Sequence, residues 1–259
     1  RMKERAQAIA DRMGTKIEDQ FEEGGWEKAM REAIKDVITY PAGIIKGPIV
    51  RKRKAIKWEL DEITGKHRIV RSTEFVLEYE RRAPFDIYPS PSSTGINDGD
   101  LFDRHRLRRS DLVAMKGVDG YDSAAIDLVL DEYGKGGLRE WLWRDQERAT
   151  LEKRPNEWLG QGDTIDALEM WGSVSGKLLI EWGMSPDQIT DPHAEYEANV
   201  WLVGHYIIRA TLNDDPLGKR PYDKASFEEN PGAFWGMGLP EIIRDLIDIC
   251  NAAARSLIN

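Results

Sequence analysis

Cysteine is almost absent from this chain of 259 residues, which contains only Cys250. One cysteine excludes an internal disulfide and any zinc site built from several thiolates. Because Cys250 stands among apolar residues, we interpret it as a small buried hydrophobe rather than a reactive thiol. The sequence also lacks an apolar run near the roughly 20 residues that span a bilayer, so we expect no membrane partner.

Basic residues are outnumbered, with 37 Lys and Arg against 46 Asp and Glu and a net charge of −9. This balance argues against a protein that holds nucleic acid mainly by neutralising its phosphates. The excess acid lies toward the C-terminus. Residues 1–154 carry 30 basic against 29 acidic side chains, and residues 155–259 carry 7 against 17. With 41% hydrophobic residues, the chain still has enough apolar side chains for a sizeable core.

Both ends of the sequence suggest a piece of a longer protein. The sequence has no initiator methionine, and its last residues lie inside a helical apolar pattern without a capping residue. We therefore interpret the chain as a fragment.

The first forty residues predict two helices separated by a glycine pair at 24–25. The second helix should end before Pro41, because the residue preceding a proline is pushed out of the helical region. We expect an α-hairpin over residues 1–40, in which an apolar stripe of the first helix packs on an apolar face of the second. The stripe consists of Ile9, Met13 and Ile17, and the opposing face of Trp26, Ile34 and Ile38.

Residues 41–238 predict an α+β domain. Alternating apolar residues indicate a β-hairpin over residues 56–79 that turns at Thr64 and Gly65. Ser110 and Asp122 are good helix N-caps, so a helical insert is expected over about residues 110–152. Candidate strands follow, and the last two form a tight hairpin. These strands cover residues 167–173, 178–182, 196–203 and 206–212.

Residues 239–259 predict a final helix with Pro240 in its first turn. Its apolar residues form two adjoining rows, whereas a lone surface helix needs only one. We therefore expect both flanks of this helix to pack, and we assign subunit packing to its apolar positions. They are Ile242, Ile243, Leu246, Ile247, Ile249, Cys250, Ala253 and Leu257.

The sequence contains two near-matches to known catalytic and phosphate-binding motifs, and both lack an essential residue. Residues 172–176 have valine where a nucleophile elbow needs serine. With Lys177 added, the stretch also fails as a phosphate loop, because Trp171 stands where the first glycine should be and Leu178 where a hydroxyl residue should hold magnesium. The histidines lack metal-ligand spacing on a helix, and Asp191 with His193 is more simply a loop. We therefore expect no enzyme activity, no cofactor and no metal. The histidines are His67, His105, His193 and His205.

Two basic runs allow two interpretations. The first consists of Arg51, Lys52, Arg53 and Lys54, and the second lies within residues 104–109. Each could contact phosphates weakly, or each could be a charged strand that discourages edge-to-edge pairing. We favour the charged strand and keep the first run as a weak DNA contact.

Several short segments occur together in a recognisable order. They are YPAG from residue 40, PFDIYP from residue 84, DTIDALE from residue 163, YEANVWL from residue 196, DPLGKRPY from residue 215 and PGAFWG from residue 231. This combination covers most of the chain and resembles the portal proteins of tailed bacteriophages and prophages, also called head-to-tail connectors.

The resemblance implies a structural subunit of a ring, usually a dodecamer, at one vertex of the capsid. The genome is packaged and ejected through the ring, with capsid protein, terminase and tail or adaptor proteins as partners. It also implies a virion location, assembly in the host cytoplasm, and DNA that passes through the channel non-specifically. In this family an outer α+β wing leads to a stem helix. The clip, the returning stem helix and the channel loop would then follow Asn259.

Two alternatives stay open from the sequence. One is an accessory domain of a nucleic-acid-processing enzyme, in which the basic runs bind phosphate and acidic residues hold magnesium. The other is a prophage tail or adhesion component, which would share a symmetric assembly but not the packaging motor.

Overall fold

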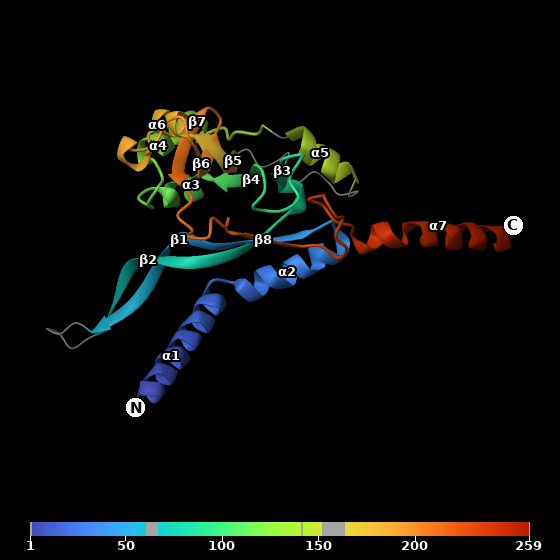
Figure 1. The fold of residues 1–259 in the computed structure, drawn as a ribbon, viewed down its shortest axis with the longest axis horizontal. Coiled ribbons are helices and arrows are strands. Elements are labelled where there is room, and N and C mark those ends of the chain that lie inside the picture. The colour runs from blue at the N-terminus through green and yellow to red at the C-terminus, as the bar shows by residue number, and fades with distance from the viewer. Residues whose placement is uncertain (1, 61–66, 141, 152–163, 259) are drawn as a thin grey trace. The chain divides into compact units, whose positions relative to one another are not determined.

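A computed structural model describes residues 2–60, 67–140, 142–151 and 164–258. Helices and antiparallel sheets together confirm the α+β class (Figure 1). The chain divides into two compact units. The first joins Arg1–Pro84 to Pro221–Asn259, and the second is Phe85–Arg220. The expected domain range 41–238 therefore includes strands of both units.

Two helices begin the first unit. They are α1 (Met2–Glu23) and α2 (Trp26–Thr39). Gly25 between them has φ 74°, a left-handed conformation that glycine adopts without steric cost. Tyr40 is extended and ends α2 before Pro41, as the sequence predicts.

The predicted packing of α1 on α2 is wrong. The exposed side chains are Ile9, Met13 and Ile17 on α1, and Ile34 and Ile38 on α2. Figure 1 shows α2 leading onward from α1 instead of folding back along it. Instead, α2 turns Ala29 and Ala33 toward the sheet. Contact across the bend comes from Phe21, whose ring centroid lies 5.5 Å from those of Trp26 and Tyr79.

A three-stranded antiparallel sheet forms the centre of the first unit, in the order β2-β1-β8. Its strands are β1 (Gly43–Leu60), β2 (His67–Arg82) and β8 (Tyr222–Ala225). The predicted β-hairpin is confirmed and is longer than expected, while its turn at Thr64 and Gly65 lies outside the described residues. The sequence did not predict β8, because four residues inside a polar connector show too little alternation.

The final helix, α7 (Leu239–Ile258), is confirmed. A Cβ atom at Gly238 would lie 3.0 Å from the carbonyl oxygens of Thr39 and Tyr40, so the chain enters α7 beside the end of α2. From there α7 runs away from the strands of its unit (Figure 1). Among the described residues, every helix is too short or too polar to cross a membrane.

The second unit is built on a five-stranded antiparallel sheet in the order β3-β4-β5-β6-β7. Its strands are β3 (Ile87–Pro89), β4 (Leu101–Arg108), β5 (Thr164–Ser175), β6 (Glu195–Val203) and β7 (Tyr206–Leu212). Strands β5, β6 and β7 confirm the predicted meander. Asp103 pairs with Glu169 across β4 and β5, and Glu169 pairs with Trp201 across β5 and β6.

One predicted strand is wrong. Residues 178–182 lie mostly in α6 (Gly176–Glu181), a short helix. A brief apolar run does not distinguish a buried strand from a turn of buried helix by periodicity alone. Within this helix Leu179 is buried, while Leu178 is exposed. Leu179 packs in a core cluster with Val174 and Val200.

Three helices confirm the predicted helical insert. They are α3 (Arg109–Met115), α4 (Ser123–Tyr133) and α5 (Leu142–Leu151). Asp122 caps α4 as predicted, because its carboxylate accepts a hydrogen bond from the Ala124 N–H at 2.8 Å. The cap of α3 is Arg108 rather than Ser110, and the Asp111 carboxylate accepts the Arg108 N–H at 2.8 Å. The core of α3, α4 and the sheet includes Leu112, Ile126, Val129, Ile165, Val203 and Ile208.

Candidate functional site

The apolar side chains of α7 lie at the surface of the chain. Leu246 is 63% exposed and Ile249 is 67% exposed. Of the eight residues assigned to subunit packing, only Ile243 is half-buried, and the others are exposed. The interpretation of Cys250 as a buried hydrophobe is wrong for this chain, because its thiol is exposed. The side chain of Ile258 lies outside the described residues.

This exposure distinguishes α7 from an ordinary surface helix. A surface helix buries one apolar stripe against its own domain and turns charges outward. Here both adjoining apolar rows are exposed except at Ile243, and the polar stripe on the remaining side of the helix carries Arg244 and Asp245 in an exposed ion pair at 3.6 Å. Because contiguous exposed apolar surface is typical of interaction sites, α7 is the strongest candidate for a binding surface.

The first basic run lies on β1 and pairs with acidic residues of its own hairpin. Arg51 donates to Glu80 at 2.8 Å and lies 3.4 Å from Glu78. Arg53 donates to Glu78 at 2.6 Å. Lys52 and Lys54 are exposed. These cross-strand ion pairs support the charged-strand interpretation over a surface reserved for phosphate.

The second basic run is used inside the second unit. Arg104 is buried and donates to both carboxylate oxygens of Asp145 at 2.9 Å and to Asp166 at 3.2 Å. Burial disfavours its charge, but the hydrogen bonds and the carboxylate charges outweigh that cost, so the pKa of Arg104 is raised. Arg106 donates to Asp86 at 2.8 Å. Both interpretations of the second run are therefore wrong for Arg104, because its enclosed guanidinium neither reaches phosphate nor presents charge at a strand edge.

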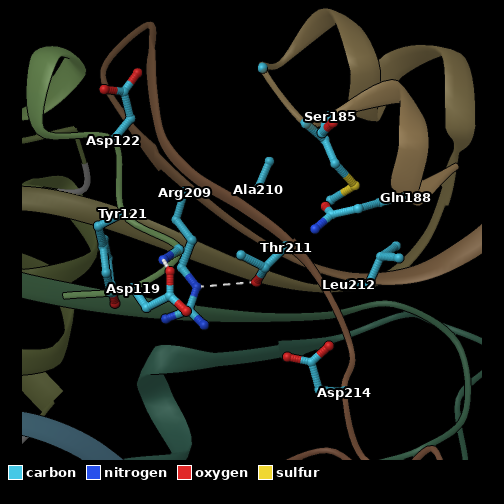
Figure 2. A pocket seen from close by; sticks show the side chains of 13 residues that line it. Asp119, Tyr121, Asp122, Ser185, Gln188, Arg209, Ala210, Thr211, Leu212 and Asp214 are labelled. Atoms are coloured by element: carbon cyan, nitrogen blue, oxygen red, sulfur yellow. Dashed lines mark hydrogen bonds between the residues drawn. The ribbon is translucent and has the colours of Figure 1, made fainter.

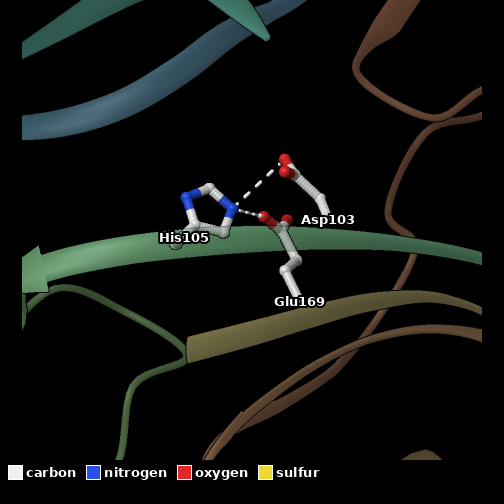
Figure 3. A group of neighbouring side chains, drawn as sticks. All are labelled: Asp103, His105 and Glu169. Atoms are coloured by element: carbon white, nitrogen blue, oxygen red, sulfur yellow. Dashed lines mark hydrogen bonds and ion pairs between the residues drawn. The ribbon is translucent and has the colours of Figure 1, made fainter. Parts of the chain in front are cut away.

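The opposite face of β4 carries a buried cluster that the sequence did not indicate. Figure 3 shows Asp103 and Glu169 turned toward the ring of His105. The His105 Nε2 lies 2.8 Å from a Glu169 oxygen and 3.2 Å from an Asp103 oxygen. Two more donors hold the other Glu169 oxygen, the Trp171 Nε1 at 2.8 Å and the Asn199 amide at 2.9 Å. The strand register, not sequence spacing, assembles this group.

A polar cavity of about 700 Å³ opens beside β7 in the second unit. Figure 2 shows Arg209 between Tyr121 and Thr211, with Ser185 and Gln188 across the cavity. The guanidinium of Arg209 lies 4.8 Å from the centre of the Tyr121 ring, and its Nε donates to the Thr211 hydroxyl at 3.2 Å. The lining residues include the carboxylates of Asp119, Asp122 and Asp214 but no histidine or cysteine.

Residues 215–220 of the DPLGKRPY segment have an architectural role within the second unit. The Asp215 carboxylate accepts the backbone N–H groups of Leu217 and Lys219, which closes a tight turn. The buried guanidinium of Arg220 then donates to Glu197 at 2.7 Å and to the Ile96 carbonyl at 2.8 Å. This segment therefore fastens a loop to strand β6. Asp163, the first residue of the DTIDALE segment, lies outside the described residues.

Comparison of the chain with protein-family models finds no match, and comparison with curated proteins finds none either.

Proposed function

We propose that this chain is a subunit of a phage portal ring, in which α7 is the first stem helix. The observation that carries the proposal is the exposure of both apolar rows of α7 on a helix that runs away from its own sheet. A helix of this kind gains stability only when other surfaces cover it, since exposed apolar area is costly. In a ring, each copy has a neighbour on either side, and each neighbour covers one row.

The distribution of charge supports the same proposal. A channel for DNA should not bind its cargo tightly, because tight binding would oppose translocation. The acidic excess of residues 155–259 repels phosphates, and the polar stripe of α7 carries acidic residues such as Asp245 and Asp248. The proposed DNA contact is therefore weak and non-specific.

The remaining partners follow from the proposed place at the capsid vertex. The outer α+β part would contact capsid protein, and terminase and the tail or adaptor proteins would be the other partners of the ring. In this role the chain positions DNA and catalyses no reaction. The protein would be located in the host cytoplasm during assembly and in the virion afterwards.

This proposal can be tested by measuring the particle mass and the nuclease and ATPase activities of one purified sample. The complete gene product is purified, and its particle mass is measured by analytical ultracentrifugation, with nuclease and ATPase assays on the same sample. We expect a closed oligomer, usually of twelve copies, and no metal-dependent turnover above a heat-treated control. Monomers with such turnover would instead identify an accessory domain of a nucleic-acid-processing enzyme.

A further inference from the structure

We infer that Asp103, His105 and Glu169 form an internal binding site for a divalent transition-metal ion of the zinc class. One imidazole nitrogen and two carboxylate oxygens, one from each side chain, all lie within 4.8 Å of one another. All three residues are buried, and they come from two adjacent strands, β4 and β5. The inference is independent of the portal proposal.

The distances suit a single shared ion. Ligand atoms bound 2.0–2.1 Å from a tetrahedral zinc ion lie about 3.4 Å apart. The His105 Nε2 lies 2.8 Å and 3.2 Å from the two carboxylate oxygens, so small side-chain movements would admit the ion. The ion would replace the direct hydrogen bond between the His105 ring and the Glu169 carboxylate.

The surroundings of Glu169 resemble the outer shell of a metal site. The Trp171 indole N–H and the Asn199 amide donate to one oxygen of Glu169 and leave the other oxygen directed at His105. Such hydrogen bonds fix the orientation of a ligating carboxylate. The ring of Trp201, 4.4 Å from that of His105, holds the imidazole against the core.

The donor set selects the class of ion. An imidazole with two carboxylates suits zinc and similar transition metals, whereas magnesium and calcium prefer sites made of oxygen alone. Because the ligands are buried, the ion would enter during folding and leave slowly. Its role would be to join β4 to β5 beneath α3 and α4.

Metal content tests the inference. The 259-residue chain is produced in zinc-supplemented medium, dialysed against EDTA, and measured by inductively coupled plasma mass spectrometry. We expect about one zinc ion per chain. His105→Gln and Glu169→Gln should lower the content to background, while His193→Gln, at an exposed loop histidine, should retain it.

A second measurement covers variants that do not fold. The unchanged chain is refolded with zinc or with EDTA, and the two melting temperatures are compared. A higher melting temperature with zinc is expected, since an ion bound only by the native state stabilises it. Three outcomes would each overturn the inference in favour of a cluster held by hydrogen bonds alone. They are background zinc in the unchanged chain, equal melting temperatures, and zinc retained by His105→Gln.

Discussion

Replacing Leu246 of α7 by aspartate should affect assembly of the ring much more than folding of the single chain. Leu246 is 63% exposed, so its own chain covers only about a third of it. Full burial of a leucine side chain contributes about 1.5–3 kcal/mol. The covered third therefore contributes about 0.5–1 kcal/mol to folding, and about 1–2 kcal/mol is left for contact with a neighbour.

The effect on assembly should be much larger than the effect on folding. Leu246→Asp removes that apolar contact and also places an unpaired carboxylate in the seam, which costs several kcal/mol more. Together these terms exceed about 2.7 kcal/mol, so association at each seam should weaken by about a hundredfold or more. Ile243→Asp, in the other row, should also impair assembly, but it should lower the stability of the chain more than Leu246→Asp does, because Ile243 is half-buried in its own chain. Asp248→Asn should be tolerated.

Two assays report the two effects. The melting temperature of the 259-residue chain should change little with Leu246→Asp, and sedimentation of the complete gene product should shift from rings toward monomers. Leu217→Asp is a matched control, because Leu217 is also exposed but lies on a loop of the second unit. Normal rings with both rows disrupted would refute the role of α7, as would a large loss of chain stability.

Three further predictions concern the hairpin, the first helix and the second unit. Ile17→Asp should lower the free energy of unfolding by no more than about 1.5 kcal/mol, because Ile17 is 47% exposed and its chain covers only about half of it, and a loss above about 3 kcal/mol in urea unfolding would contradict this. Changing residues 51–54 to glutamine should leave the weak DNA affinity and its salt dependence nearly unaltered, as measured by fluorescence anisotropy; a drop of about four charges in the salt slope would contradict it. Arg104→Met should cost about 3–5 kcal/mol in urea unfolding, since it leaves Asp145 and Asp166 as buried charges without their guanidinium; a loss below 1 kcal/mol would show that water reaches them.

The sequence predicted those helices and strands whose formation depends on neighbouring residues. Alternation identified the hairpin and the meander, and Asp122 marked the start of α4 because N-capping depends on a few neighbouring residues. Alternation failed at α6, where a short apolar run fits either conformation. It also missed β8, whose partner Gly43–Lys46 lies far away in sequence.

The packing of α1 and the buried cluster of Asp103, His105 and Glu169 could not be predicted, because both depend on contacts between residues that are distant in sequence. The bend at Gly24 and Gly25 determines whether α1 meets α2, and periodicity carries no information about its angle. The buried cluster exists because the register of β4 and β5 pairs Asp103 with Glu169. Its one local signal was Asp103 and His105 two residues apart, which places both on one face of a strand. The two apolar rows of α7 are visible in the sequence, and because the single chain leaves them largely exposed, their packing against other subunits stays a prediction.

Single-particle cryo-electron microscopy of the complete gene product tests the portal proposal most directly. The account predicts a closed ring of identical subunits around a central channel, with α7 of each copy packed between its two neighbours. Monomers, or an assembly in which α7 remains in contact with solvent on both rows, would contradict it.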